Sequence, residues 1–231
     1  MKVDIGIIGA LQNEVDGIIE KLSSAVVEKV SGIDFYVGDM YGKKIAVAKC
    51  GVGKVFAAIC AEAMILKYNP SLIVNTGVAG GIKAGLSTSD IVIANRLLQH
   101  DMDTSPIGDP KGLISGINKI YFDADLRACS ILLSAAEELS LKAEIGVIAS
   151  GDTFVASKEK KQEIEELFSA AACEMEGGAI AHTAYVNGTP FCVIRAISDS
   201  ADGEATMDYP TFMPIAAKNS SKLTLKLISN Y

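Results

Sequence analysis

The amino-acid sequence predicts a three-layer αβα fold with a central, mixed and twisted β-sheet. Short runs of apolar and β-branched residues are mostly continuous rather than alternating, which is typical of strands covered on both faces of a sheet. Segments with helical spacing separate most of these runs, as parallel strands with crossover helices require. One pair of runs joined by a short glycine-containing turn indicates a β-hairpin, so the sheet is expected to be mixed.

The expected elements alternate along the chain. Apolar, β-branched runs predict strands over 5–8, 45–48, 72–74, 91–94, 145–149 and 191–197. Helical spacing of apolar residues predicts helices over 14–22, 55–67, 124–139, 158–168, 178–186 and 209–228. Residues 34–40 and 44–49 are expected to pair as a hairpin across Tyr41-Gly42-Lys43. We expect one domain spanning residues 1–231.

Composition and charge narrow the function classes. The 231 residues are 49% hydrophobic and 21% charged, which is enough for one large buried core. The formal net charge of -7 leaves no basic patch for a phosphate backbone, and the lysine run 158–161 is interrupted by Glu159. We therefore expect no nucleic-acid partner.

The chain is expected to be cytoplasmic. Its five cysteines include no Cys-x-x-Cys pair, and several lie inside apolar runs, as buried and reduced thiols do. The first residues lead into an apolar strand that ends by Gln12-Asn13-Glu14, without a signal-peptide core or an apolar span of membrane length. We expect no association with a membrane.

One stretch, residues 98–121, resists assignment to a helix or a strand. It contains spaced prolines and glycines together with several acids, and a loop of that length in a compact domain is usually functional or ordered by a partner. A surface loop without a role is the alternative. Within it, His100-Asp101-Met102-Asp103 could suggest a metal, but His182 lies on a separate expected helix and cannot assist. A solvated loop, with no metal or other cofactor, is therefore expected.

Three glycine-containing segments adjoin expected strands. Gly6-Ile7-Ile8-Gly9 lacks the dinucleotide-binding pattern, and Gly51-Val52-Gly53-Lys54-Val55 lacks both the earlier glycine and the following hydroxyl residue of a P-loop. Residues 75–81 follow the expected strand 72–74, and their small side chains allow a flat or ring-shaped ligand to approach the backbone. A tight turn chosen only for positive φ is an equally open interpretation.

Acidic residues stand where apolar runs give way to polar ones. Glu174 and Glu176 are expected on one side of an extended segment, with Met175 on the other. Asp199 ends the last expected strand, where either a tuned pKa or a helix N-cap is expected. Glu14, taken alone, is most simply a solvated acid favoured by a helix dipole. Carboxylates at strand ends face a cleft, and paired carboxylates can perform acid/base chemistry on a sugar bond.

Together these segments resemble the 5'-methylthioadenosine/S-adenosylhomocysteine nucleosidases, a family within the nucleoside phosphorylase superfamily. The resemblance covers nearly the whole chain, and six motifs occur in the family's order. They are Ile5-Gly6-Ile7-Ile8-Gly9-Ala10 with Glu14, Gly51-Val52-Gly53-Lys54-Val55, Asn75-Thr76-Gly77 with Ala79-Gly80-Gly81, Ser150-Gly151-Asp152 with Phe154, Glu174-Met175-Glu176, and Arg195-Ala196-Ile197-Ser198-Asp199.

The resemblance implies a hydrolase that cleaves the N-glycosidic bond of 5'-methylthioadenosine and S-adenosylhomocysteine, with 5'-deoxyadenosine as a further candidate substrate. It implies that Asp199 is the general acid that protonates adenine, that Glu14 activates water, and that Glu176 binds the ribose hydroxyls. Arg195 is implied to help hold the water. This division agrees with the chemistry, because a leaving base needs a proton donor while water attacks an oxocarbenium-like sugar.

The same resemblance implies a largely apolar pocket. Phe154 is implied to stack on adenine, with the Val155 backbone and the Ser198 hydroxyl reading its edge, and Met175 to contact the ribose. The remaining lining positions that it implies are Leu11, Val52, Val78, Ala79, Gly80 and Tyr209. The long loop reaches a neighbouring subunit's site in the family, which implies a homodimer whose 98–121 loop completes the neighbouring site.

The sequence departs from the commoner family pattern at two places. Val78 stands where many members carry a serine that helps hold the water, so water positioning would depend more on Glu14 and Arg195. In the long loop, less apolar residues stand where the family lines its alkylthio pocket: Thr104, Ile107 and Ser115. The preference among the three candidate substrates therefore stays open.

Two alternatives accompany the nucleosidase interpretation. The superfamily's phosphorylases hold phosphate with arginines around the glycine-rich segments, whereas 9–14 and 77–81 contain no Arg or Lys, which favours water as the nucleophile. A futalosine-type nucleosidase, or a purine nucleoside phosphorylase for another nucleoside, is the alternative enzyme. A non-catalytic sensor of adenosyl ligands is the alternative binder, although such a protein has no need for Glu14, Glu176 and Asp199 together.

Overall fold

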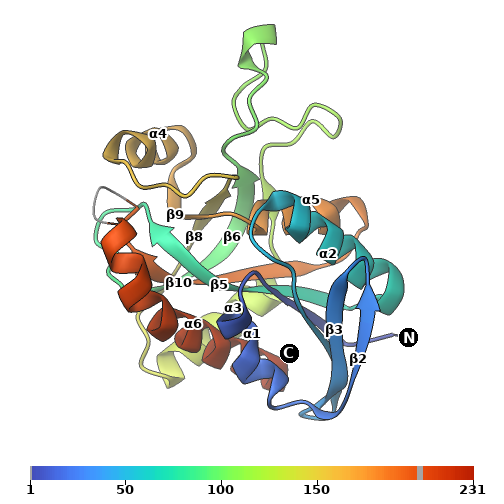
Figure 1. Ribbon diagram of the computed structural model, residues 1–231. Helices are drawn as coiled ribbons and strands as arrows, with labels where there is room; N and C mark the ends of the chain where they lie inside the picture. Colours follow the sequence, from blue (N-terminus) through green and yellow to red (C-terminus); the bar gives the residue numbers. More distant parts are fainter. Residues whose placement is uncertain (1, 202–204) are drawn as a thin grey trace.

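The computed structural model describes residues 2–201 and 205–231, without the side chains of 206–208, and forms three layers (Figure 1). The strands of the central sheet are β1 (Ile5–Gly9), β2 (Ser23–Val30), β3 (Ile33–Met40), β4 (Lys43–Lys49), β5 (Leu72–Gly81), β6 (Ile91–Gln99), β7 (Phe122–Asp123), β8 (Ala143–Ser150), β9 (Ala170–Glu174) and β10 (Phe191–Asp199). The helices are α1 (Gln12–Ile19), α2 (Lys54–Tyr68), α3 (Leu126–Glu138), α4 (Lys158–Phe168), α5 (Gly177–Val186) and α6 (Ala205–Asn230).

The sheet is mixed and partly closed. Its strand order is β10-β6-β8-β9-β5-β1-β4-β3-β2, and β10 additionally pairs with β5, so the five strands at one end of the order form a closed ring. Parallel pairing joins β1 to β4 and β5, and β10 to β5, whereas β2, β3 and β4 are antiparallel. Helices α2 and α5 pack together on one face, and α1, α3 and α6 cover the other (Figure 1).

The hairpin predicted from the sequence is confirmed. Strands β3 and β4 pair antiparallel, and Tyr41 and Gly42 between them adopt φ values of 51° and 76°. Positive φ at both central residues is the requirement of the two-residue turn whose twist matches that of the flanking strands. The five cysteines are buried and free, as expected for reduced core thiols.

The structure corrects the interpretation of residues 75–81. They do not form a turn after a short strand; instead they continue β5 to Gly81, where the strand pairs with β10 and then with β9. None of the glycines in this segment has positive φ. Small side chains are needed there because charged side chains of the site lie close to this backbone.

Three strands were absent from the predicted set: β2, β9 and the two-residue β7, which pairs with β6. Strand β2 forms the edge of the sheet and is mostly exposed, and its sequence carries only the short apolar run Ala25-Val26-Val27. Strand β9, with the sequence AAACE, has weak intrinsic strand propensity and is buried between β8 and β5. Pairing with its neighbours outweighs local preference there.

The C-terminal helix is attached to the sheet beneath the site. The hydroxyl groups of Thr76 on β5 and Ser220 on α6 lie 2.7 Å apart, and Ser220 also accepts a hydrogen bond from the Gly77 backbone N–H at 3.1 Å. Ser221 donates to the carbonyl of Glu14 at 3.0 Å. Helix α6 thereby fixes both β5 and the start of α1.

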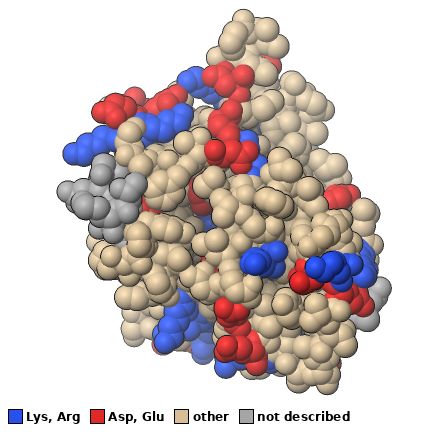
Figure 2. Space-filling model, in the orientation of Figure 1, with Lys and Arg blue, Asp and Glu red and all other residues tan. Residues whose placement is uncertain are grey.

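The molecular surface carries mixed charge. On the face shown in Figure 2, lysines and arginines are interspersed with acids rather than gathered into one patch. Among the helices within residues 2–201 and 205–231, none combines the length and the hydrophobicity that crossing a bilayer requires.

Candidate active site

A cavity opens at the carboxyl ends of β1, β5, β9 and β10, the usual place for a ligand in an α/β sheet. Most of the residues predicted for the site line it: Leu11, Glu14, Val52, Val78, Ala79, Gly80, Phe154, Val155, Met175, Glu176, Ser198, Asp199 and Tyr209. The lining also includes residues that the sequence did not assign to the site, namely Ala10, Thr153, Cys173 and Glu174. Glu174 is the most consequential of these additions.

Glu14 lies at the floor of the cavity and is 4% exposed, so its interpretation as a solvated acid is wrong. The backbone N–H groups of Ala10 and Leu11 donate to its Oε2 at 2.7 and 2.8 Å. The Val78 backbone N–H donates to Oε1 at 3.1 Å. Burial raises the pKa of Glu14, although Arg195 and these three N–H groups oppose the rise. A carboxyl group shifted in this direction is suited to accept a proton near neutral pH.

Arg195, on β10, lies beneath the cavity rather than in its lining and is 2% exposed. Its Nη2 donates to Asn75 Oδ1 at 2.6 Å and also to the carboxylate of Glu174. Glu176 is a more distant partner, with Oε2 at 3.7 Å from the same nitrogen. The guanidinium charge is therefore already compensated by carboxylates of the protein.

Glu174 ends β9 and is surrounded by donors. The Ser150 hydroxyl donates to Oε1, and the backbone N–H groups of Glu176 and Gly177 donate to Oε2 at 3.0 and 2.7 Å. Burial alone would raise the pKa of Glu174, but Arg195 and these hydrogen bonds outweigh it and lower the pKa. Glu174 is consequently a stable anion.

Glu176 occupies the N-cap position of α5, because β9 ends two residues earlier. The extended segment that was predicted to place Glu174 and Glu176 on one side therefore ends at Glu174. Both carboxylates nevertheless lie near the Arg195 guanidinium. Burial and the negative charge of Glu174 raise the pKa of Glu176 to about 7, against the opposing effects of Arg195 and the Gly53 backbone N–H. That N–H donates to Glu176 Oε1 at 2.9 Å.

The glycines of β5 give these carboxylates room. A Cβ added to Gly77 would lie 2.5 Å from Glu14 Oε1 and 2.7 Å from Arg195 Nη1. One added to Gly80 would lie 3.0 Å from Asp199 Oδ1. Charged side chains of the protein itself thus lie close to the backbone for which the sequence predicted the approach of a flat or ring-shaped ligand.

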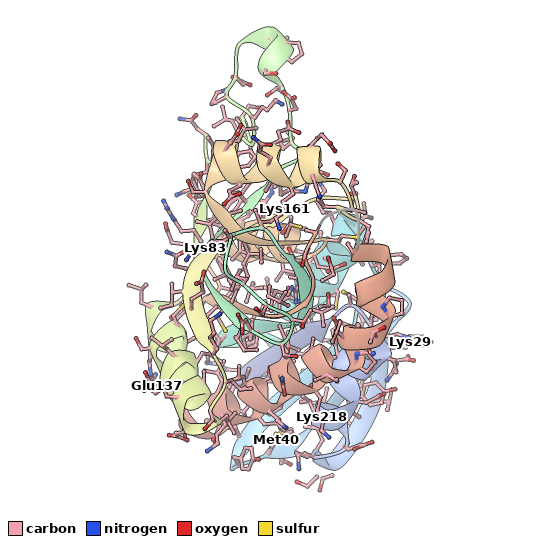
Figure 3. All side chains as sticks on the ribbon, turned by 90° about the vertical axis from the view of Figure 1, so that its left-hand side faces the viewer. Lys29, Met40, Lys83, Glu137, Lys161 and Lys218 are labelled. Carbon is pink, nitrogen blue, oxygen red and sulfur yellow. The ribbon has the colours of Figure 1, made fainter. Side chains whose placement is uncertain are left out.

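Asp199 ends β10 and is 2% exposed. The Ser198 hydroxyl donates to its Oδ2 at 2.8 Å, and the Ala201 backbone N–H donates to Oδ1 at 2.9 Å. The next residue, Ser200, is held by a neighbouring helix, because Lys161 Nζ donates to its carbonyl at 2.7 Å. Lys161 belongs to α4 and is labelled in Figure 3, near the sheet side of that helix.

Two aromatic rings meet at the cavity. Phe154 and Tyr209 pack edge to face, with ring centroids 5.6 Å apart and planes at 84°. Phe154 lines the cavity and remains 44% exposed, so it is accessible to a ligand. Together with Leu11, Val78 and Met175, these rings make an apolar slot suited to a flat heteroaromatic group.

The remaining predicted positions do not reach this cavity. Thr104, Ile107 and Ser115 lie on the loop that projects from the body of the molecule (Figure 1), outside the cavity lining. Ile107, in the short 3-10 helix Ser105–Ile107, is 82% exposed. Lys111 in the same loop pairs with Glu163 of α4 at 2.8 Å.

The base of this loop differs from the predicted solvated segment. His100 is 5% exposed, and Asp101 pairs with Lys54 at 2.7 Å. Within the described part of the chain, no cluster of histidine, cysteine and acidic side chains is arranged to hold a metal ion.

Known proteins resemble this chain along nearly its full length. The sequence pattern of the phosphorylase superfamily matches residues 4–229. A 5'-methylthioadenosine/S-adenosylhomocysteine nucleosidase from Actinobacillus succinogenes is 35% identical over 226 residues, covering 97% of this chain and 98% of that protein.

Solved structures share the architecture. The native futalosine hydrolase of Helicobacter pylori superposes with a TM-score of 0.95 at 34% identity, covering 99% of this chain and 98% of that one. A 5'-methylthioadenosine/S-adenosylhomocysteine nucleosidase from Neisseria meningitidis, in complex with methylthio-immucillin-A, gives a TM-score of 0.95 at 33% identity, covering 99% of both chains. The predicted fold class is confirmed.

Proposed function

This chain belongs to the phosphorylase superfamily, and on that premise we propose that it hydrolyses the N-glycosidic bond of 5'-methylthioadenosine and S-adenosylhomocysteine. The products are adenine and the 5'-substituted ribose. The name of the Actinobacillus succinogenes relative and the ligand bound to the Neisseria meningitidis structure agree with the enzyme class that the sequence predicts.

The way in which the site's positive groups are paired favours water over phosphate as the nucleophile. Two features of the described site that could bind an anion already have carboxylates of the protein as partners. Arg195 is bound to Glu174, and the N–H groups of Gly53 and Lys54 at the start of α2 donate to Glu176 and Asp152. The described residues that line the cavity include no lysine or arginine. A phosphate dianion would meet uncompensated negative charge there, whereas a neutral water would not.

The reaction divides among three carboxyl groups. Asp199 gives a proton to the purine ring as the bond between C1' and the base nitrogen breaks, so adenine leaves as a neutral molecule. Glu14 takes a proton from the water whose oxygen joins C1'. Glu176 binds the ribose hydroxyls and, when ionised, stabilises the positive charge that develops on the sugar. Arg195 acts on Glu14 and Glu176 through its charge and helps hold the water.

The apolar slot accepts the base. Phe154 stacks on adenine, and Tyr209 packs edge to face against the Phe154 ring. The Val155 backbone and the Ser198 hydroxyl read the polar edge of the base, while Met175 contacts the ribose. Val52, Ala79 and Gly80 complete the walls around the nucleoside.

We also propose that the active form is a cytoplasmic homodimer. The outward faces of α2 and α5 carry exposed apolar side chains, including Val55 at 68%, Phe56 at 56% and Val186 at 61%. Apolar surface of this kind is typical of an interface with a partner. A second copy seated there brings the projecting loop, with Thr104, Ile107 and Ser115, to the 5' end of the neighbouring cavity.

A futalosine-type nucleosidase is the second candidate function. The futalosine hydrolase of Helicobacter pylori superposes as well as the nucleosidases do. The described single-chain cavity is built around the base and the ribose, so the residues that distinguish the 5' substituent are those on the projecting loop.

The test is a substrate panel read by chromatography. Adenine release is measured from 5'-methylthioadenosine, S-adenosylhomocysteine and 5'-deoxyadenosine, and base release from futalosine, each with and without phosphate. We expect the first two to be cleaved at rates that phosphate does not change. Cleavage of futalosine alone would favour the second candidate. A strict requirement for phosphate would overturn the proposed hydrolysis, and no cleavage of any substrate would favour a sensor.

A further inference from the structure

Glu174 is a charged residue of the cavity to which the proposed reaction gives no task. Its side chain is 2% exposed, and four donors from separate positions surround its two oxygens. An ionised carboxylate is costly to bury unless such partners compensate it. The charge of Glu174 acts on two neighbouring site residues, Arg195 and Glu176.

The first consequence concerns Arg195. Glu174 on β9 and Asn75 on β5 both accept from its Nη2. Asn75 is itself fixed, because its Nδ2 donates to the Ile8 carbonyl at 2.9 Å. The guanidinium is therefore held between two strands, and Glu176 remains at 3.7 Å, with the Gly53 N–H as its closer partner. Among the described residues, Arg195 is the only cation that forms an ion pair with either carboxylate, so Glu174 competes with Glu176 for it.

The second consequence concerns the charge on Glu176. The charged groups that act on it come from three elements: Glu174 on β9, Arg195 on β10 and Glu14 on α1. Two of the three are carboxylates, so the Glu176 carboxyl group faces net negative charge in a buried place. Its proton is retained to a higher pH than that of an ordinary glutamate, and the midpoint near 7 follows from this balance.

We infer that Glu174 is a positioning residue for the hydrolysis: it holds Arg195 in place and sets the charge state of Glu176. The inference rests on the proposed function for its kinetic readout. The ionised form of Glu176 is the one that stabilises a developing positive charge, and Glu14 must be ionised to accept a proton from water. The value of kcat/KM for 5'-methylthioadenosine therefore rises with pH as these two groups ionise. The effect of Glu174 is therefore measurable as the position of that rise.

The kinetic test compares Glu174→Gln with the unaltered protein from about pH 5 to 9. The variant removes a negative charge and frees Arg195 to pair with Glu176, so Glu176 keeps its proton less strongly. We expect the rise in kcat/KM to move to lower pH by about one unit or more. The plateau at high pH is expected to fall roughly tenfold, because Arg195 loses its fixed position. Glu174→Asp, which keeps the charge, should return the midpoint toward that of the unaltered protein.

The matched control is Glu138→Gln, a surface change at an exposed residue that pairs with Lys226. It should leave both the midpoint and the plateau unchanged. A Glu174→Gln variant whose plateau falls while its midpoint stays in place would overturn the inference, since a merely structural residue behaves that way.

A second measurement does not depend on turnover or on a buried variant that folds poorly. Side-chain carboxyl carbons of ¹³C-glutamate-labelled protein are titrated by NMR, with Glu176→Gln used for assignment. We expect a carboxyl group that titrates near pH 7 and whose signal is absent from the Glu176→Gln spectrum. A Glu176→Gln spectrum that retains every near-neutral titration of the unaltered protein would contradict the inference. Because no substrate is present, failure here is distinct from failure of the proposed hydrolysis.

Discussion

Glu14, Glu174, Glu176 and Asp199 are all buried carboxyl groups, yet their surroundings give them different properties. Glu14 is held by three backbone N–H groups, which fix its position whatever the side chain of Val78 is. Glu174 is held by Arg195 and is kept ionised, whereas Glu176 has its pKa raised to about 7 by burial and by Glu174. Acid and base roles can be divided in this way because environment sets the proton affinity of each group.

The sequence predicted three of these four acids, together with Arg195, through a family resemblance that extends along the chain. It did not assign Glu174 to the site, because the role of Glu174 depends on Ser150 and Arg195 from two other strands. For Glu14, the sequence predicted the residue but not its surroundings. Its place in a first helical turn is visible in the sequence, but its burial depends on β5 lying against it.

Replacing Asp199 with asparagine tests the proton donor. The amide keeps the shape of the side chain but cannot supply an acidic proton to the base. We expect kcat for 5'-methylthioadenosine to fall by roughly a hundred- to ten-thousand-fold, the usual range for general acid catalysis, with the fold retained by circular dichroism. Asp123→Asn, on the exposed part of β7, serves as the control. Turnover near the unaltered rate in Asp199→Asn would remove Asp199 from the mechanism.

At the scale of secondary-structure elements, most helices and the strands with continuous apolar runs could be predicted, because their patterns are local. Helix α4 spans the predicted residues, and α2 and α5 begin one residue earlier. The extension of β5 through 75–81 could not be predicted, since glycine and alanine carry little strand preference. That extension is fixed by pairing with β10, which is remote in sequence.

Gly77→Ala tests whether β5 must be free of side chains at the site. The new Cβ would lie 2.5 Å from Glu14 Oε1 and 2.7 Å from Arg195 Nη1, and neither is free to move away. We expect a loss of about 1–3 kcal/mol in unfolding free energy and a marked loss of turnover. Gly17→Ala is the matched control, because nothing lies within 4 Å of its added Cβ. Equal stability and activity in the two variants would contradict the account of β5.

Lys161→Gln tests the attachment of α4 to the turn after Asp199. The ammonium group donates to the Ser200 carbonyl at 2.7 Å, and a shorter neutral side chain does not maintain that contact. A hydrogen bond from a charged group contributes about 1.5–3 kcal/mol, so kcat/KM is expected to fall roughly tenfold. Lys158→Gln, at an exposed position in the first turn of α4, should have no effect. Equal kinetics for the two variants would show that the turn holds Asp199 without Lys161.

At the scale of the whole molecule, the closed ring of strands brings β5, β9 and β10 to one cavity, and β1 joins them because it pairs with β5. Strand order and closure depend on pairings between distant segments, which no local pattern encodes, so the sequence predicted the layers but not the ring. The projecting loop was recognised as unusual from its length and composition. Its position away from the cavity of its own chain is consistent with the proposed dimer.

Phe56→Asp tests the dimer. Phe56 of α2 is 56% exposed and belongs to the apolar side chains of the proposed interface, where a buried charge is costly. We expect the unaltered protein to elute at about twice 24.2 kDa at micromolar concentration and the variant to elute as a monomer with weakened activity. Leu126→Asp, on α3 at the other face of the sheet, is the control. A monomeric protein with full activity would contradict the shared site.

The identity of the sugar product tests the central claim most directly. The protein is incubated with 5'-methylthioadenosine in excess phosphate, and the sugar is identified by mass spectrometry. Because Arg195 and the start of α2 are occupied by carboxylates, we predict free 5-methylthioribose, formed in equal amount to adenine, and no phosphorylated sugar. Formation of 5-methylthioribose 1-phosphate would contradict the claim that this site admits water and excludes phosphate.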